Sequence, residues 1–277
     1  MLELLSMAGK HVIITGAGRG LGKQMALALA DAGADIVCAA RTPEQIEETA
    51  EEIRERGRRA LAIPTDVSQS DQVDALVQSA IDAWGRVDVM IANAGGGGKA
   101  ALKDVSEITN EDWYDTIDIN FSSAFFCSRA IVPHFREQGG GVIINVASGT
   151  GMRGDPRLLV YGSSKAGVVT LTMSVANQVA KDNIRVNAIV PGFVLQKYLD
   201  SDEEISATRG RGRFIPAGRV GEAWELGPLA LYLASDASRY VTGEAFVIDG
   251  GGLAGGIAPS GWDVMAPSGT GVGGLGR

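Results

Sequence analysis

Short runs rich in Val and Ile alternate along this chain with longer amphipathic stretches, and this alternation limits the possible folds more than any other feature. The runs are apolar almost throughout, as expected for strands covered on both faces of a parallel sheet. They occupy residues 11–15, 34–40, 60–63, 87–92, 141–148 and 184–190. Helix-like periodicity fills the intervals, at 20–32, 43–56, 70–84, 112–137 and 162–181. This order predicts a doubly wound α/β domain with ligand sites at the carboxyl ends of the strands.

The bulk composition fits one folded domain. The chain has 277 residues, of which 45% are hydrophobic and 21% charged, enough for one large core. We expect a catalytic domain over 1–251. The Gly-, Ser- and Pro-rich stretch 252–277 resembles a linker, and we expect it to form a C-terminal tail.

Charge and apolar patterning exclude several classes of protein. A net charge of −8 opposes general binding to nucleic acid or to an anionic membrane. The first residues lack a signal-peptide pattern, and no segment offers the roughly 18 apolar residues of a membrane span, so we expect a cytoplasmic protein. Cys38 and Cys127 lie in apolar runs that favour free buried thiols. With only His11 and His134, a His-based metal site is not expected.

A glycine-rich loop, TGAGRGLG, follows the first predicted strand at Thr15–Gly22. Glycines allow close approach of the backbone to a phosphate, and the N-terminus of the following helix supplies free N–H groups. The spacing of Gly16, Gly20 and Gly22 differs from the common G-x-G-x-x-G fingerprint. A dinucleotide site and a ligand-free strand-to-helix turn are both compatible with the loop alone.

The segment YGSSK places Tyr161 and Lys165 on one face of a predicted helix. An ammonium beside a phenol favours the phenolate and lowers the pKa of the phenol, which makes it a usable proton donor or acceptor near neutral pH. An isolated Y-x-x-x-K also occurs without any function, so the interpretation depends on the accompanying motifs.

Those motifs resemble the short-chain dehydrogenase/reductase family from about Lys10 to Gly251. Besides the glycine loop and YGSSK, they are NAG at 93–95, IN ending at Asn120, NVAS ending at Ser148, PG at 191–192 and VIDGGG at 247–252. Their agreement in order makes a chance match of YGSSK improbable. The resemblance implies a single Rossmann-type domain with a mostly parallel seven-stranded sheet.

The resemblance also implies catalytic roles for four residues. Ser148 is expected to hydrogen-bond the substrate oxygen, and Tyr161 to exchange a proton with that oxygen while hydride moves to or from the nicotinamide. Lys165 is expected to favour the phenolate and to hold the nicotinamide ribose. Asn120 is expected to keep a water molecule near Lys165, although a purely structural Asn is the alternative.

The cofactor contacts implied by the resemblance form a larger set. They are Gly16, Arg19, Gly20, Leu21, Gly22, Arg41, Asp66, Val67, Asn93, Ala94, Gly95, Tyr161, Lys165, Pro191, Gly192 and Val194. Asp66 is expected to accept a hydrogen bond from the adenine amino group. One departure is Gln196, which stands where many relatives have a threonine near the carboxamide or pyrophosphate.

The end of the second predicted strand bears on the choice of cofactor. Relatives that use NAD usually place a carboxylate about eighteen residues after the last glycine, where it binds the adenosine ribose. Here that position is Ala40, and Arg41 follows it. Without a carboxylate to repel a 2′-phosphate, and with arginines at 41 and 19 to bind one, NADP(H) is favoured and NAD(H) remains possible.

The substrate is less constrained by the sequence. Residues 195–215 lie where the family has a variable lid. The predicted pocket walls are Gly149, Thr150, Met152, Arg153, Leu158, Phe193 and Tyr198. RGRGR at 209–213 could bind a substrate phosphate or carboxylate, or form a solvated face.

Two classes of function follow. The first is an enzyme that interconverts a secondary alcohol and its ketone, most simply a ketone or 3-oxoacyl reductase, with a dehydrogenase of sugars, polyols or cyclic alcohols as the alternative. The second is a dinucleotide-binding regulatory protein without catalysis, which the intact set of four residues opposes. By resemblance, and from the apolar run that begins at Phe121, we expect a homotetramer that pairs helices 112–137 and 162–181.

Overall fold

A single parallel sheet organises the computed structural model, which describes residues 2–195 and 202–254. Seven strands lie in the order β3-β2-β1-β4-β5-β6-β9, and each neighbouring pair is parallel. The strands are β1 His11–Thr15, β2 Asp35–Ala40, β3 Ala60–Pro64, β4 Val89–Ala92, β5 Gly141–Val146, β6 Ile184–Pro191 and β9 Ala245–Ile248. The predicted doubly wound, Rossmann-type domain with a seven-stranded sheet is thereby confirmed.

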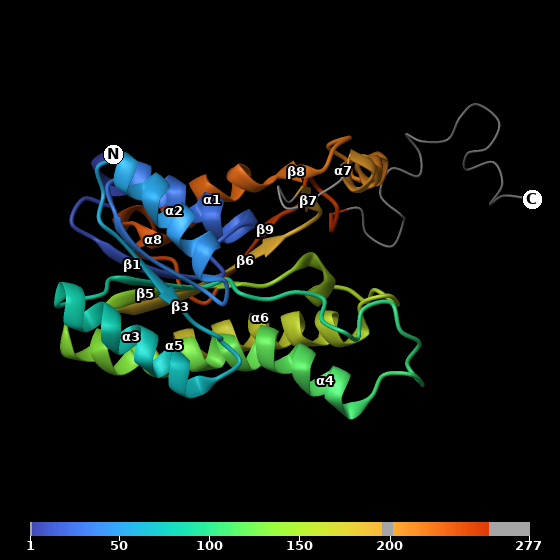
Figure 1. Ribbon diagram of the computed structural model, residues 1–277, viewed down its shortest axis with the longest axis horizontal. Coiled ribbons are helices and arrows are strands. Elements are labelled where there is room, and N and C mark those ends of the chain that lie inside the picture. Colours follow the sequence, from blue (N-terminus) through green and yellow to red (C-terminus); the bar gives the residue numbers. More distant parts are fainter. Residues whose placement is uncertain (1, 196–201, 255–277) are drawn as a thin grey trace, which may run out of the picture.

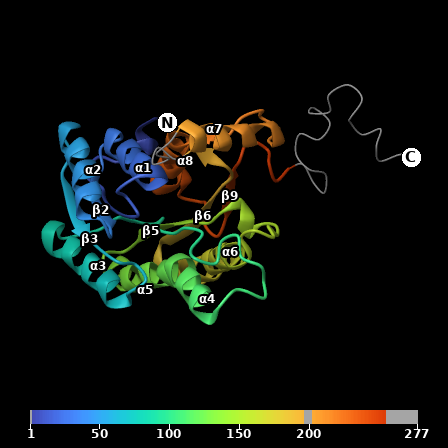
Figure 2. The same cartoon turned by 45° about the vertical axis from the view of Figure 1, so that its right-hand side comes forward.

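Helices cover both faces of this sheet (Figure 1, Figure 2). One face carries α1 Gly20–Asp31, α2 Pro43–Glu55 and α8 Gly227–Ala234. The opposite face carries α3 Ser70–Trp84, α5 Ser123–Glu137 and α6 Leu159–Val179, with α4 Asn110–Ile117 leading into α5. Two short strands, β7 Val194–Leu195 and β8 Gly221–Glu222, pair beside α7 Asp202–Gly210.

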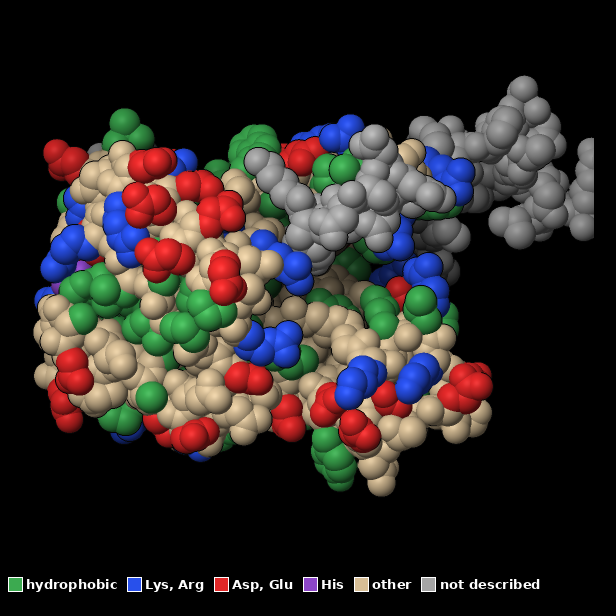
Figure 3. All heavy atoms as spheres, in the orientation of Figure 1, with side chains coloured by type: hydrophobic (Ala, Val, Ile, Leu, Met, Phe, Trp, Pro, Cys, Tyr) green, Lys and Arg blue, Asp and Glu red, His purple; other side chains and the backbone are tan. Residues whose placement is uncertain are grey.

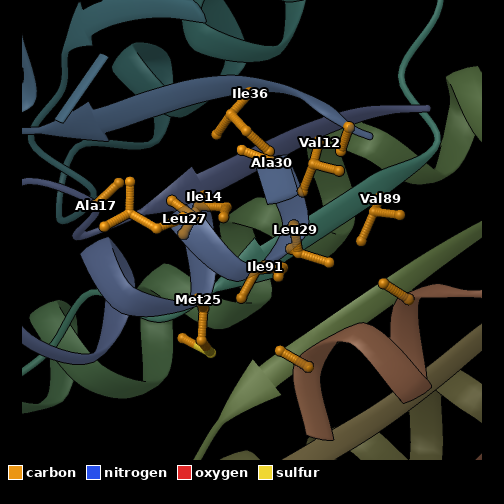
Figure 4. Packing of buried hydrophobic residues seen from close by; sticks show 14 of the residues in the cluster. Val12, Ile14, Ala17, Met25, Leu27, Leu29, Ala30, Ile36, Val89 and Ile91 are labelled. Atoms are coloured by element: carbon orange, nitrogen blue, oxygen red, sulfur yellow. The ribbon is translucent and has the colours of Figure 1, made fainter. Parts of the chain in front are cut away.

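The apolar strands divide their side chains between two cores. Val12 and Ile14 belong to the same buried cluster as Met25 and Leu29 of α1 (Figure 4). Ile13 belongs to the cluster on the opposite face of the sheet. All five residues of β1 are buried. Burial on both faces explains why the strands are apolar throughout rather than alternating.

The stretch 112–137 was predicted as one continuous helix, but the structure interrupts it. It consists of α4, a π-helical turn at Asp118–Ser122, and α5. The N–H of Ser123 bonds the carbonyl of Asp118, five residues earlier, so one extra residue is accommodated there. A π turn inside a helix often marks a functional position, and Asn120 lies within this one.

Other boundaries differ by a few residues. Helix α6 begins at Leu159 rather than 162, and β5 ends at Val146, so Ser148 lies just beyond the strand. Gln196, Tyr198 and nearly all of the Gly-rich tail, from residue 255 onward, lie outside the described residues. None of the helices in the described ranges combines the length and apolar character needed to cross a bilayer.

Candidate functional site

The glycine loop turns sharply between β1 and α1. Gly16 has a φ of +68°, in the left-handed region that favours glycine. A Cβ on Gly22 would collide with the carbonyl of Gly16, so these two glycines bring helix and loop into contact. The first turn of α1 lines a cleft, and its N–H groups favour an anionic group there.

The NAG segment packs directly beside this loop. The Asn93 side-chain amide donates to the Thr15 carbonyl at 2.9 Å, and Thr15 Oγ1 accepts from the backbone N–H of Asn93 and of Ala94 at 3.0 and 3.1 Å. An added Cβ on Gly16 would contact the Asn93 amide. These bonds fix the ends of β1 and β4 against each other at the point where the strand order reverses.

A cleft of about 460 Å³ runs along these strand ends. The predicted cofactor residues that line it are Gly16, Arg19, Leu21, Gly22, Arg41, Val67, Asn93, Ala94, Gly95, Tyr161, Lys165, Pro191, Gly192 and Val194. Gly20 is buried as the first residue of α1. The glycine-lined wall and the free helix N-terminus suit the pyrophosphate of a dinucleotide.

Asp66 is placed differently from the other predicted contacts. Its neighbours Thr65 and Val67 line the cleft, whereas Asp66 Oδ1 accepts hydrogen bonds from the backbone N–H and the hydroxyl of Ser68, at 3.0 and 2.8 Å. One carboxylate oxygen is therefore engaged in the turn that leads toward α3.

At the end of β2 the structure adds residues that sequence reasoning missed. Thr42 and Gln45 line the cleft with Ala40 and Arg41. Gln45 belongs to the first turn of α2, and its side chain lies close to Gly18 of the glycine loop. The sequence signal was the helix start at Pro43, which brings a residue of the first turn back over the strand end.

Tyr161 and Lys165 both lie on α6, as predicted, and both line the cleft. The Lys165 ammonium is 5.8 Å from the centre of the Tyr161 ring and donates to the Val146 carbonyl at 2.8 Å. Only 3% of Lys165 is exposed, and its burial lowers the pKa of the ammonium to about 8.

Asn120 converges on the same place from the π turn. Its amide accepts from the N–H of Gly96 at 3.0 Å and donates to the carbonyls of Gly96 and Thr116 at 2.8 Å each. A Cβ on Gly95 would contact both Asn120 Oδ1 and Lys165 Nζ. Gly95 thus lets the amide and the ammonium approach each other.

Ser148 follows β5 and is oriented by its neighbour. The hydroxyl of Thr150 donates to Ser148 Oγ at 2.9 Å, and the Thr150 N–H contacts the same oxygen at 3.3 Å. With its oxygen accepting both bonds, Ser148 keeps its own O–H available for another acceptor. Sequence reasoning had placed Thr150 only in a pocket wall.

A second cavity, of about 680 Å³, opens from the cleft. The two share Ser148, Tyr161, Pro191, Gly192 and Phe193. Of the predicted substrate walls, Gly149, Thr150, Arg153, Leu158 and Phe193 line the second cavity, and Met152 lines an adjoining depression. Figure 3 shows this face hollowed, with Lys and Arg side chains on the rim.

Metal ligation has no candidate among residues 2–195 and 202–254, because no three His, Cys, Asp or Glu side chains converge there. Cys38 and Cys127 are free and buried, and burial raises the pKa of each thiol to about 12. Neither thiol is a reactive group at neutral pH.

Comparisons with known proteins agree with this geometry. The sequence model of the short chain dehydrogenase family matches residues 10–205. The chain is 40% identical over 259 residues to 2-dehydro-3-deoxy-D-gluconate 5-dehydrogenase of Escherichia coli, a match that covers 92% of this chain and 99% of that protein. It is 35% identical over 252 residues to a 3-oxoacyl-[acyl-carrier-protein] reductase of Synechocystis sp., covering 90% and 98%.

A solved oxidoreductase structure also matches this chain in fold and sequence. The NADPH-dependent 3-quinuclidinone reductase from Rhodotorula rubra matches with a TM-score of 0.82 at 33% identity, over 91% of this chain and 94% of that one. All three named proteins are oxidoreductases, which favours the enzyme over the regulatory alternative. This chain therefore belongs to the short-chain dehydrogenase/reductase family of NAD(P)-dependent oxidoreductases.

Proposed function

We propose that this protein transfers hydride between NADP(H) and a secondary alcohol or its ketone, with Tyr161 as the general acid and base. The observation that carries the proposal is that the cofactor cleft and the second cavity meet at Ser148 and Tyr161. A carbonyl group placed there would lie between a nicotinamide in the cleft and the hydroxyl groups of both residues.

In the direction of reduction, Ser148 donates a hydrogen bond to the carbonyl oxygen and so polarises the C=O bond. A nicotinamide held in the cleft would supply the hydride that forms the new C–H bond. Tyr161 donates its phenolic proton to the same oxygen. The π electron pair of the C=O bond moves onto that oxygen and forms the O–H bond of the alcohol. Oxidation reverses each transfer, with Tyr161 accepting the proton.

Lys165 and Asn120 support the proton transfer. The buried Lys165 ammonium stabilises the phenolate that remains after the proton has left Tyr161. Asn120 and Lys165 converge at Gly95, and we propose that they hold a water there through which Tyr161 regains its proton from solvent. Thr150 orients Ser148 rather than acting on the substrate.

The preference for NADP(H) rests on the end of β2. Ala40 offers no carboxylate to repel a 2′-phosphate, while Arg41, Thr42 and Gln45 line that part of the cleft. A guanidinium with adjacent hydroxyl and amide donors is suited to a phosphate. NAD(H) is the alternative.

For the substrate we propose a ketone or 3-oxoacyl compound, because Leu158, Phe193 and Phe214 give the second cavity apolar walls. The second candidate is a sugar-acid dehydrogenase, which the 40% identity to 2-dehydro-3-deoxy-D-gluconate 5-dehydrogenase favours.

We further propose a cytoplasmic homotetramer whose subunits pair through α4, α5 and α6. Phe125 on α5 and Met173 on α6 are 44% and 48% exposed, so both helices present large apolar side chains that a neighbouring subunit could cover. Free buried cysteines suit a reducing compartment.

The test is a screen of ketones and secondary alcohols with NADPH, NADP, NADH and NAD, followed by nicotinamide absorbance. We expect turnover of at least one carbonyl compound, and a loss of about 100-fold or more in Ser148→Ala. An active wild type whose Ser148→Ala variant keeps its rate would contradict the proposed site.

A further inference from the structure

The second cavity carries more positive charge than the protein around it. Three arginines line it, Arg153, Arg157 and Arg211, against two aspartates, Asp155 and Asp249. The excess is one positive charge in a chain whose net charge is −8. A local field opposite in sign to that of the whole molecule favours an anion at this position.

The two aspartates are already engaged. Arg157 donates to both carboxylate oxygens of Asp155 at 3.3 Å, which neutralises that pair. Burial alone would raise the pKa of Asp155, but the hydrogen bonds and charge of Arg157, together with the charge of Arg153, lower it on balance. Asp249 accepts from the N–H groups of Gly251 and Leu253, at 2.8 and 2.6 Å. Neither carboxylate is therefore held by Arg211.

Arg211 is the arginine left over, whereas the charge of Arg153 also acts on Asp155 without a direct ion pair. Among the side chains at residues 2–195, 205–206 and 208–254, no carboxylate forms an ion pair with either guanidinium. Arg211 begins the short 3-10 turn Arg211–Phe214, and its guanidinium lies 5.0 Å from the centre of the Phe193 ring. Phe193 lines both cavities, so this contact holds a positive charge along the wall that leads to Tyr161.

The rest of that wall is mainly apolar. Leu158, Phe214, Ile215 and Leu253 line the cavity with Phe193. A polyhydroxylated substrate would lose hydrogen bonds to water against such residues, whereas an alkyl chain would gain from contact with them.

We propose that the substrate is an amphipathic oxyanion: a ketone or secondary alcohol on an apolar chain that also carries a carboxylate or phosphate bound by Arg211 and Arg153. This inference rests on the proposed function, since Ser148 and Tyr161 define where the reacting carbon lies. It names the substrate class of that same site and selects against hydrophilic sugar acids.

The test compares matched substrate pairs by kcat/KM with wild-type enzyme. The carboxylate pair is a 4-oxo acid and its methyl ester. Its chain has about six to ten carbons, a length suited to a cavity of this size. The phosphate pair is a 3-oxoacyl thioester of coenzyme A and the same acyl group on N-acetylcysteamine, which has no phosphate. We expect the anionic member to be favoured by about 10-fold or more in at least one pair. Each added methylene should raise kcat/KM roughly three- to fourfold.

Arg211→Gln assigns the effect to a residue. It should lower kcat/KM for the favoured anion by about 10- to 100-fold, whereas its neutral partner should lose less than about threefold. Arg213→Gln is the matched control: Arg213 is on the same turn, with its guanidinium 4.6 Å from the Phe214 ring, and it does not line the cavity. If Arg211→Gln fails to fold, Arg153→Gln makes the same comparison.

The possible failures are distinguishable. Equal use of anionic and neutral members in both pairs, or equal losses in Arg211→Gln and Arg213→Gln, would overturn the inference and leave the proposed function intact. So would turnover of a keto-gluconate together with rejection of every apolar probe. No nicotinamide-dependent turnover of any carbonyl compound would instead count against the proposed function itself.

Discussion

The ammonium of Lys165 lies 5.8 Å from the centre of the Tyr161 ring, one helical turn away, and donates to the carbonyl of Val146 at 2.8 Å. The carbonyl at the end of β5 thus holds the Lys165 ammonium beside the Tyr161 phenol. Burial lowers the pKa of Lys165 to about 8, so the folded protein holds this charge at a cost. A group kept charged at a cost to stability is expected at a functional position.

Replacing this charge should trade activity for stability. The lowered pKa of Lys165 means that the buried ammonium reduces the folding stability of the wild type by about 3 kcal/mol at neutral pH. Lys165→Met removes this cost but also loses the hydrogen bond to Val146, which offsets about 1 kcal/mol of the gain. Lys165→Met should therefore unfold at a higher temperature than wild type at pH 7, by a few degrees, and show almost no turnover. Thermal unfolding of both proteins without cofactor checks this.

The gain should depend on pH in a defined direction. Between about pH 8 and the ordinary lysine pKa of 10.5, the unfolded wild type binds more protons than the folded protein, so its stability rises with pH. The advantage of Lys165→Met should thus be largest below pH 8 and fade toward pH 10.5. A gain that grows with pH would show that burial of the charge is not its cause.

Thr150 should act through Ser148. Thr150→Val removes the hydroxyl that donates to Ser148 Oγ and should lower kcat about 2- to 10-fold, with little change in cofactor affinity. Thr150→Ser restores the hydroxyl and should recover most of the rate. Equal activity of the Val and Ser variants would mean that the 2.9 Å contact has no catalytic consequence.

Cofactor preference should reside at the end of β2. The wild type should have the higher kcat/KM with NADPH, and Ala40→Asp/Arg41→Ala should lose that preference, because it adds a repelling carboxylate and removes a guanidinium. Gln45→Ala in the wild-type background should weaken NADPH more than NADH. A wild type that prefers NADH would refute the assignment.

The assembly can be tested on the exposed face of α5 and α6. Light scattering at micromolar concentration should give a tetramer, and Phe125→Glu or Met173→Glu should yield smaller species, since a buried unpaired carboxylate opposes association. Leu102→Glu, at a side chain that is 77% exposed in the loop before α4, is the control and should leave the mass unchanged. A monomeric wild type would exclude this proposal.

Local patterns predicted the framework of this molecule well. Unbroken apolar runs gave the positions of β1 to β6, and glycine spacing with a following helix gave the loop Thr15–Gly22. The pair Tyr161 and Lys165 required only helical periodicity, which α6 supplies. These features depend on residues close in sequence.

Features that depend on distant residues were not predicted. The Asn120 side chain in the π turn forms hydrogen bonds with Gly96, twenty-four residues away. The apolar periodicity of 112–137 gives no sign of the extra residue in that turn. Gln45 enters the cleft only because α2 packs beside the glycine loop. Asp66 accepts two hydrogen bonds from Ser68 in a local turn, and the family resemblance did not predict this turn.

The most direct test of the central claim is the rate of hydride transfer in Tyr161→Phe, measured with saturating cofactor beside the cofactor dissociation constant. The ring remains on α6 and only the proton-transferring hydroxyl is lost, so affinity for the cofactor should stay nearly unchanged. Turnover should fall by about 100- to 10,000-fold, the usual loss when a general acid–base group is removed. A variant that binds cofactor normally and keeps more than about a tenth of the wild-type rate would contradict the account.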